Sequence, residues 1–193
     1  MLMLQPLNLE TEKYKIHSFR KEDIESHERI AEQVLFIFSD PFTLKFVPGK
    51  KLQGIEHARD FIKTMIINNH VGKSHIHFIT SKDMDSIVGI VDLIPPDIAR
   101  QHYILDNYPH FIEFYLSESF SGKSVMTELL PIITASFFKQ DIKEIAAVVN
   151  RHNAGAVKVL NRAGFSYVKA FDPLQDLYIN SQNASNISDH LLK

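Results

Sequence analysis

Residues 111–130 read FIEFYLSESFSGKSVMTELL and lie in the most informative part of the chain. Its apolar run at 111–116 predicts a strand, its polar elbow is SGKS at 121–124, and a helical pattern begins near Val125. This order places free backbone N–H groups and a helix N-terminus beside Lys123. The stretch therefore predicts a site for a phosphate-bearing ligand at the elbow.

A second junction between a strand and a helix follows about thirty residues later. The apolar segment 142–149 predicts a buried strand, and NRHN at 150–153 forms the junction. Residues 154–163 predict a short helix that Gly164 ends. Polar residues thus follow two strands of the predicted sheet.

The remaining segments predict a mixed α/β domain. Pro95 and Pro96 end one strand, and the connection 97–110 has the pattern of a long loop, which in a compact domain is more often functional than idle. Pro131 predicts that the helix near Val125 is kinked or starts later than its pattern indicates. The other predicted strands are 14–19, 75–80, 87–94, 166–170 and 177–179, with 75–80 and 87–94 as a hairpin. The predicted helices are 21–38 and a second helix after Gly54, whose apolar face runs from Ala58 to Ile66 and which ends near Asn68.

Length and composition fit one globular domain. The chain has 193 residues, of which 45% are hydrophobic, and this supports a single domain at 1–180 followed by a polar tail at 181–193. A net charge of −2 argues against a general nucleic-acid or membrane-surface binder. The absence of cysteine excludes disulfides, thiol nucleophiles and thiolate metal sites. No signal-peptide pattern and no run of about 18 apolar residues occur, so we expect a cytoplasmic protein.

Two other interpretations of the elbow stay open on the local sequence. Gly-Lys-Ser after a strand and before a helix is also the end of the nucleotide-binding P-loop pattern, but Ser117 stands five residues before Gly122, where that pattern requires glycine. The second alternative is an ordinary loop with a solvated Lys123. A nucleotide binder is therefore less favoured, but neither alternative is excluded.

The elbow and four further segments resemble the GNAT superfamily of N-acetyltransferases, in particular its RimJ/RimL-like branch. FSGKSVMTE at 120–128 is similar to the acyl-CoA loop of that branch, and LETEK at 9–13 is similar to its opening segment. The other similar segments are SDP at 39–41, EHARDF at 56–61 and NAGAVKVLNRAGF at 153–165. The order and spacing of these segments carry the resemblance jointly.

The resemblance implies the GNAT-like acyl-CoA N-acyltransferase fold, a central, largely antiparallel, splayed sheet flanked by helices, with acetyl-CoA as co-substrate. The backbone of Phe114, Tyr115 and Leu116 would bind the pantetheine arm as an added strand would. Asn153 would reach the pantetheine or the adenosine side of the cofactor, although a helix N-cap is its other interpretation. The pyrophosphate would lie on the backbone amides of the loop, which are those of Gly122, Lys123, Ser124, Val125, Met126 and Thr127.

Two positions depart from the family pattern. Ser124 stands where the family usually has glycine, and a positive φ there would cost about 1–2 kcal/mol, whereas a negative φ would cost little. Leu160 stands where many members carry a tyrosine that acts as general acid. These departures motivate a second hypothesis, a catalytically degenerate acyl-CoA-binding protein used for sensing or partner contact.

The candidate catalytic residues are Glu113, Asp92 and Tyr115, on strands that should border the acceptor cleft. Glu113 interrupts an apolar run and is the preferred candidate for a general base that acts through water. Strand alternation leaves a solvent-facing carboxylate as the alternative for Glu113 and Asp92, and Tyr115 also suits core packing.

Two histidines, His75 and His77, point to the same side of one predicted strand. That spacing could serve zinc, but cysteine is absent and His102 and His110 lie on a connection that the sequence does not place. We therefore predict no metal site, and expect cleft-lining or exposed histidines.

The predicted function is transfer of an acetyl group from acetyl-CoA to a primary amine, either a protein N-terminus or a small amine. Loop shape selects the acceptor in this fold, so the sequence does not identify it. We expect neither a nucleic-acid nor a membrane partner. The oligomeric state stays open, with a homodimer among the outcomes.

Overall fold

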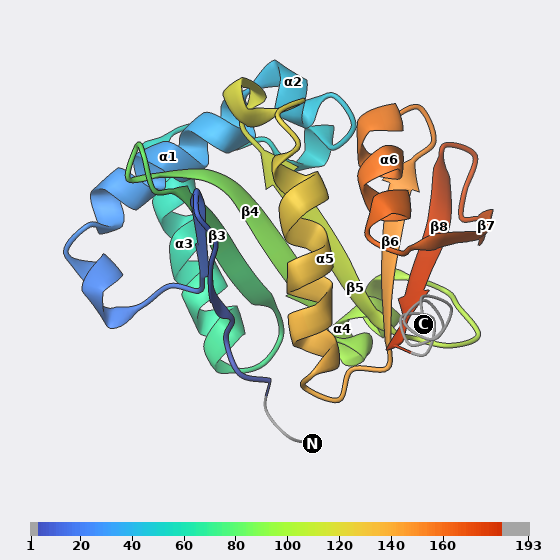
Figure 1. Cartoon of the computed structure of the whole chain (residues 1–193). Helices are drawn as coiled ribbons and strands as arrows, with labels where there is room; N and C mark the ends of the chain where they lie inside the picture. The colour runs from blue at the N-terminus through green and yellow to red at the C-terminus, as the bar shows by residue number, and fades with distance from the viewer. Residues whose placement is uncertain (1–3, 183–193) are drawn as a thin grey trace. The chain divides into compact units, whose positions relative to one another are not determined.

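The computed structural model describes residues 4–182 and divides the chain into two compact units (Figure 1). The first unit comprises Met1–Leu93 and Phe114–Ser121, and the second comprises Ile94–Glu113 and Gly122–Lys193. Strand β5, His110–Leu116, therefore contributes its first half to the second unit and its second half to the first. The expectation of a single acetyltransferase domain stays a prediction.

The first unit is built on antiparallel strands in the order β1-β2-β3-β4, with the second half of β5 beside β4. The predicted hairpin is confirmed, since β3 and β4 pair from His75↔Leu93 to Ser81↔Ser86. The strands are β1 Asn8–Glu10, β2 Tyr14–His17, β3 His75–Ser81 and β4 Ser86–Ile94, and the helices are η1 Lys21–Ile24, α1 His27–Ser39, α2 Pro41–Leu44, η2 Pro48–Lys50, α3 Ile55–His70 and η3 Glu118–Phe120.

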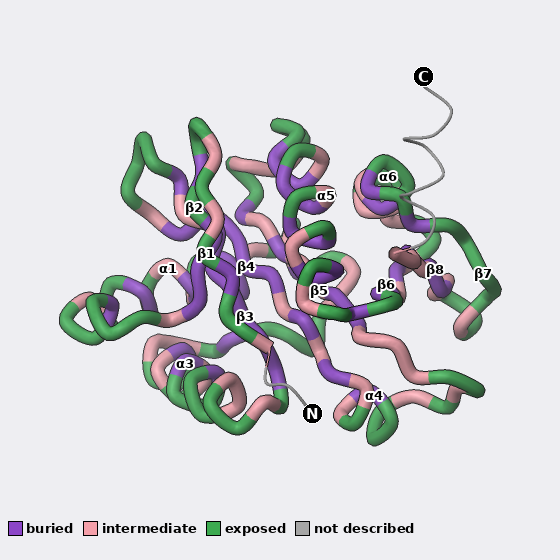
Figure 2. The backbone as a smooth tube through the Cα atoms, turned by 60° about the horizontal axis from the view of Figure 1, so that its bottom comes forward, coloured by how far each residue is buried: buried purple, intermediate pink, exposed green. Residues whose placement is uncertain are grey.

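Helices α1 and α3 lie side by side on one face of these strands (Figures 1 and 2). Both helices carry apolar residues at helical spacing, and this stripe faces the sheet. Burial of such side chains is the main favourable contribution to folding. The core of the unit includes Ile30, Val34, Phe38, Ile62, Met65, Ile76, Phe78, Ile90 and Tyr115.

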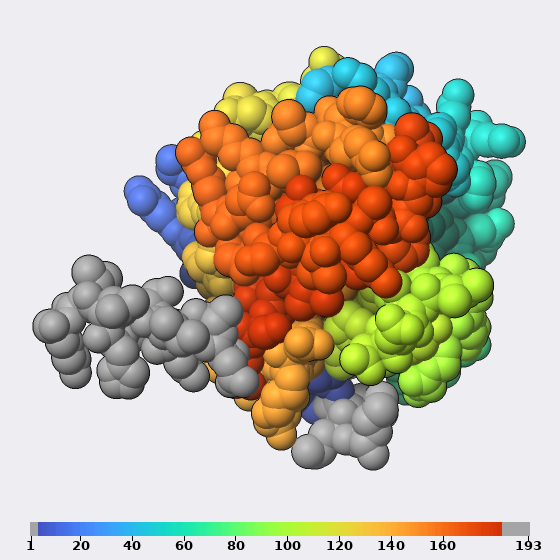
Figure 3. All heavy atoms as spheres, turned by 90° about the vertical axis from the view of Figure 1, so that its right-hand side faces the viewer, coloured from blue at the N-terminus to red at the C-terminus, as the bar shows by residue number. Residues whose placement is uncertain are grey.

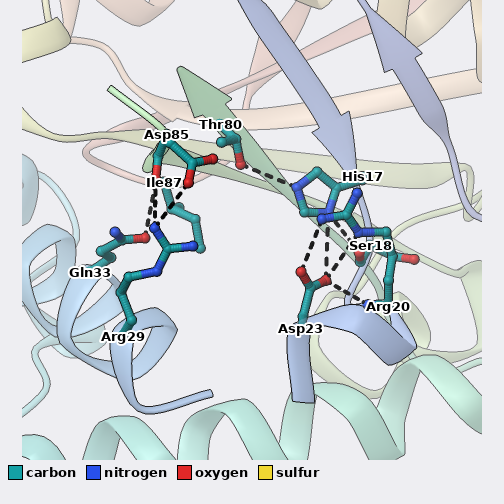
Figure 4. Close-up of polar contacts among 9 residues, drawn as sticks. All are labelled: His17, Ser18, Arg20, Asp23, Arg29, Gln33, Thr80, Asp85 and Ile87. Atoms are coloured by element: carbon teal, nitrogen blue, oxygen red, sulfur yellow. Dashed lines mark hydrogen bonds and ion pairs between the residues drawn. The ribbon is translucent and has the colours of Figure 1, made fainter. Parts of the chain in front are cut away.

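The predicted helix at 21–38 is interrupted, and a polar network explains the break (Figure 4). The Asp23 carboxylate accepts hydrogen bonds from the Arg20 backbone N–H at 2.7 Å and from the Arg20 guanidinium at 3.0 Å. These bonds close a capping turn around η1, and α1 then begins at His27. A turn of this kind satisfies backbone donors locally, so the chain forms two helices where the apolar pattern predicts one.

The second unit carries the first half of β5 beside β6, followed by β8 and β7. In the described chain β5 pairs with β6 in parallel through two residue pairs, His110 with Ile145 and Phe111 with Ala146. The β6–β8 and β7–β8 pairs are antiparallel. The elements are α4 Pro96–His102, α5 Val125–Phe138, β6 Glu144–Asn150, α6 Ala154–Arg162, β7 Ser166–Ala170 and β8 Gln175–Ser181.

Strand β7 is the outer strand of this unit, and all five of its residues are exposed. Figure 3 shows the surface that α6, β7 and β8 form, in orange and red. Strand β8, in contrast, buries Leu177, Tyr178 and Asn180. The predicted tail at 181–193 begins too early, because Ser181 still belongs to β8, while residues 183–193 lie outside the described chain.

The expectation that 97–110 is a loop is wrong, because α4 occupies the first half of it. Pro96 stands at the first turn of α4, where its fixed φ suits a helix and its missing N–H is not needed. Ala99 is buried, and the ring of Tyr103 lies 4.8 Å from that of Phe111. The connection is therefore anchored to the core of its unit rather than solvated along its length.

Helix α5 begins at Val125, as the sequence predicts, and contains Pro131 in its interior. The expectation of a later start is therefore wrong. Proline removes one backbone donor from the helix. The Thr134 hydroxyl lies 2.9 Å from the Leu130 carbonyl oxygen, to which it can donate. The Thr134 hydroxyl therefore adds a side-chain contact to the helix backbone in the turn after Pro131.

Candidate active site

The elbow between β5 and α5 has the backbone geometry of an anion site. Gly122 and Ser124 both lie in the left-handed region, with φ of 73° and 62°. The first backbone hydrogen bond of α5 runs from the Glu128 N–H to the Ser124 carbonyl at 3.0 Å. The N–H groups of 125–127 therefore have no acceptor inside the helix. A coenzyme A pyrophosphate fits such a loop, because the amides and the helix dipole both favour negative charge.

Ser124 adopts a positive φ, which is the costly one of the two conformations considered from the sequence. It is the residue before α5, and its hydroxyl makes no capping hydrogen bond to the helix. Among non-glycine residues a left-handed φ costs about 1–2 kcal/mol. The serine is exposed, so no packing interaction with the core offsets this strain.

We expect Ser124→Gly to raise the free energy of unfolding by about 1 kcal/mol, because glycine adopts this φ without steric cost and loses only part of the gain as chain entropy. Urea unfolding of the two proteins measures the difference. An unchanged or lowered stability would show that the serine hydroxyl contributes more than its backbone costs.

Asn153 has the N-cap role that the sequence offered as its alternative interpretation. Its side-chain oxygen accepts a hydrogen bond from the Ala156 N–H at 3.1 Å, at the start of α6. The residue is half-buried. Its contact with the cofactor stays a prediction.

The second half of β5 is fixed closely against β4. A Cβ added to Gly89 would lie 2.7 Å from the Tyr115 carbonyl oxygen, so only glycine allows this approach of the two strands. The Ser117 N–H donates to the Val88 carbonyl at 3.0 Å. The predicted pantetheine strand, Phe114–Leu116, is therefore held in register by its neighbour.

The three candidate catalytic residues have different environments. Tyr115 is buried, its ring lies 5.0 Å from that of Phe38, and the Lys50 ammonium lies 5.6 Å from its centre, which is the environment of a core residue. Asp92 accepts a hydrogen bond from the Ser74 hydroxyl at 2.8 Å. Glu113 is half-buried, and burial together with the charge of Glu113 raises the pKa of Tyr103. Their catalytic roles stay predictions.

Leu160 is 1% exposed and contributes its side chain to the core. The position at which many family members have a tyrosine therefore supplies no acid in this chain. A leaving thiolate would have to take its proton from another group or from water.

The expectation of exposed or cleft-lining histidines on β3 is wrong. His75 and His77 are both buried, and they lie on an inner strand of the sheet whose side chains are nearly all buried, so both faces of β3 are covered. His77 accepts a hydrogen bond from the Leu7 N–H at 2.9 Å, which ties the N-terminal segment to the sheet. Among the described side chains, no group of three or more potential ligands is placed to hold a metal ion.

Burial makes His77 a source of acid sensitivity, since it lowers the pKa of this imidazole to about 4. The unfolded chain binds the proton near pH 6.5 and the folded chain only near pH 4, so stability falls as the pH falls through this window. The total loss from this one group is about 3 kcal/mol by pH 4. We expect His77→Gln, which keeps an acceptor for the Leu7 N–H, to flatten the dependence in urea unfolding between pH 6.5 and 4. Equal slopes for the two proteins would contradict this assignment.

A family model described as an acetyltransferase (GNAT) domain matches residues 18–166. This match covers most of the chain and includes β5, the elbow and α6. The chain belongs to the GNAT acetyltransferase family. Its enzyme class is therefore that of acetyl-CoA-dependent N-acetyltransferases, with acetyl-CoA as co-substrate.

Solved structures share the fold of this GNAT chain. It is similar to ribosomal-protein-S5-alanine acetyltransferase from Vibrio fischeri, with 14% identity over 92% of this chain and 97% of that chain and a TM-score of 0.66. It is also similar to the RimL ribosomal L7/L12 α-N-protein acetyltransferase, solved with coenzyme A, with 14% identity over 90% of this chain and 97% of that chain and a TM-score of 0.66. A third similar structure is the aminoglycoside acetyltransferase AAC(6')-Ib, also solved with coenzyme A, with 10% identity over 91% of this chain and 99% of that chain and a TM-score of 0.66. These likenesses confirm the predicted fold.

No curated protein matches the sequence of this GNAT chain. Within residues 4–182, none of the helices combines the length and the apolar character that a bilayer crossing requires.

The sequence did not predict that Asp40 and Thr43 contact the end of β5. The segment 39–41 carries a signal through its family resemblance, but its local pattern indicates only the end of a helix. The structure places both residues against the end of β5, more than 70 positions later in the chain. Contacts at this separation leave no local pattern.

Proposed function

We propose that this GNAT acetyltransferase moves the acetyl group of acetyl-CoA to a primary amine, either a protein N-terminus or a small amine. The observation that carries the proposal is the elbow, where two left-handed residues precede a helix with unused N–H groups. Two structurally similar proteins are named for acetylation of ribosomal proteins, and one for aminoglycosides. These names support both acceptor classes, and the choice between them is a prediction.

We assign the cofactor contacts to the residues that the resemblance implies. The backbone of Phe114, Tyr115 and Leu116 would hydrogen-bond the pantetheine arm, as a strand edge binds a peptide. The amides of Gly122–Thr127, beside Lys123, would bind the pyrophosphate. Asn153 would contact the cofactor through the part of its amide that the N-cap does not use.

The reaction needs a neutral amine as nucleophile. The amine lone pair attacks the thioester carbonyl carbon, the C–S bond breaks, the amine loses a proton, and the thiolate of coenzyme A gains one. An α-amine has a pKa near 7.7–8.0 and a lysine amine one near 10.4, so an α-amine is already partly neutral at pH 7. Modest base assistance suffices, and we assign it to Glu113 through a water molecule, with Asp92 and Tyr115 as further candidates.

Release of free thiol from acetyl-CoA, measured with a panel of acceptors, tests this function. The panel holds peptides with a free N-terminus, the same peptides with an acetylated N-terminus and one lysine, and an aminoglycoside. We expect thiol release only with an acceptor, an equal amount of acetylated product by mass spectrometry, and a preference for the free α-amine. Release that does not depend on any acceptor would contradict an acetyl-transfer role.

The alternative is an acyl-CoA-binding protein without turnover, which the strained Ser124 and the buried Leu160 favour. Calorimetry separates the two, because that protein would bind acetyl-CoA and release no thiol with any member of the panel. The cytoplasmic location and a homodimer stay predictions.

A further inference from the structure

Asp40 and Thr43 connect the segment after α1 to the exit of β5. The Glu118 N–H donates to Asp40 Oδ2 at 3.1 Å. Thr43 Oγ1 lies 2.9 Å from the Leu116 carbonyl oxygen and 3.0 Å from Asp40 Oδ2. Two side chains from one short segment thus engage the backbone on both sides of Ser117.

The Asp40 carboxylate also shapes its own segment. Its Oδ1 accepts a hydrogen bond from the Phe42 N–H at 2.9 Å and so caps α2, and Pro41 occupies the first turn. One carboxylate therefore both begins α2 and holds the residue that begins η3. The Thr43 hydroxyl has a single proton, which it can donate either to Leu116 or to Asp40.

The contacts of Asp40 and Thr43 lie between the predicted pantetheine strand and the elbow. Leu116 ends the strand predicted to bind pantetheine, and Glu118 begins the turn that leads to the elbow at Gly122. On the other side of the strand end, the Ser117 N–H donates to the Val88 carbonyl. The exit of β5 is thus held from α2 and from β4, which fixes the backbone at the end of the strand.

We infer that Asp40 and Thr43 are positioning residues for acetyl-CoA, which hold the backbone from Leu116 to Glu118 in the geometry that the cofactor requires. The inference rests on the proposed function. Contacts with pantetheine are made equally before and during acetyl transfer, so loss of their geometry weakens binding of acetyl-CoA without slowing the chemical step. The expected signature is a raised KM for acetyl-CoA at an unchanged kcat.

The test compares Asp40→Asn and Thr43→Val with wild type. The asparagine side chain would keep an oxygen for the α2 cap, but its amide nitrogen cannot accept from the Glu118 N–H. Valine has the shape of threonine and lacks its hydroxyl. We expect each variant to raise the KM and Kd for acetyl-CoA about tenfold, with kcat and the KM for the acceptor within about twofold. Thr43→Ser restores the donor and is expected to restore wild-type values.

Asp23→Asn is the matched control. Asp23 is a second carboxylate of the same unit that accepts backbone and side-chain hydrogen bonds at a helix start, but it holds η1 (Figure 4). We expect this variant to lose stability and to keep the wild-type KM for acetyl-CoA. The inference is overturned if Asp40→Asn and Thr43→Val behave like this control, that is, if they lose stability and keep the wild-type KM for acetyl-CoA. A wild-type protein that binds no acetyl-CoA would instead overturn the proposed function itself.

Discussion

Replacing Gly122 by aspartate is expected to raise the Kd for acetyl-CoA about a hundredfold. Aspartate tolerates the left-handed φ of 73°, and a Cβ at this position meets no atom within 4 Å, so the variant should fold. Its carboxylate would lie beside the amides that we propose to bind the pyrophosphate. Two unit charges roughly 5 Å apart at an effective dielectric of ~20 repel by about 3 kcal/mol, which corresponds to about a hundredfold in affinity.

Gly72→Asp is the control for this experiment. Gly72 has a φ of 70°, and a Cβ there likewise meets no atom within 4 Å, but the residue lies in the turn after α3. Both substitutions add one negative charge on the same backbone conformation. Calorimetry should therefore show wild-type affinity for Gly72→Asp. Equal losses in the two variants would mean that the charge acts through the whole protein, and equal retention would exclude the elbow as the pyrophosphate site.

Gly89→Ala is expected to cost about 3 kcal/mol of unfolding free energy, because cores resist added volume and the clash here includes backbone. The new methyl carbon would lie 2.7 Å from the Tyr115 carbonyl oxygen and 2.6 Å from a methyl carbon of Leu116. Strand β5 has to move to relieve these contacts, so the affinity for acetyl-CoA should fall as well. Urea unfolding and calorimetry measure the two effects.

Gly54→Ala is the matched change in open space. A Cβ there meets no atom within 4 Å, and the φ of 165° is extended backbone that any residue adopts. We expect the unfolding free energy to fall by less than about 1 kcal/mol, because the only expected cost is that alanine is a weaker N-cap than glycine. A Gly89→Ala protein as stable as Gly54→Ala would show that β4 and β5 separate at little cost.

Short sequence patterns correctly predicted the elements whose conformation depends mainly on neighbouring residues. The polar elbow before Val125 predicted the start of α5 there, and the positive φ of Gly122 and Ser124 in the structure keeps both residues outside the helix. The hairpin of β3 and β4 follows from two apolar runs around a polar turn. The N-cap role of Asn153 was offered by its residue type and position alone.

Contacts between residues far apart in the chain explain where the structure differs from the sequence-based predictions. Helix α4 is short and is stabilised by Ala99 and Tyr103, whose core contacts a local pattern does not reveal. The burial of His75 and His77 depends on what packs on the two faces of the sheet, which the sequence of β3 does not show. Asp40 reaches Glu118 across 78 positions. In each case a tertiary contact outweighed a local preference.

Calorimetric titration with acetyl-CoA shows directly whether the elbow is a coenzyme A site. We predict binding of one acetyl-CoA per chain, loss of about a hundredfold in affinity in Gly122→Asp, and no change in Gly72→Asp. Absence of acetyl-CoA binding by the wild-type protein, with binding of ATP and magnesium in its place, would contradict the claim and favour the nucleotide alternative.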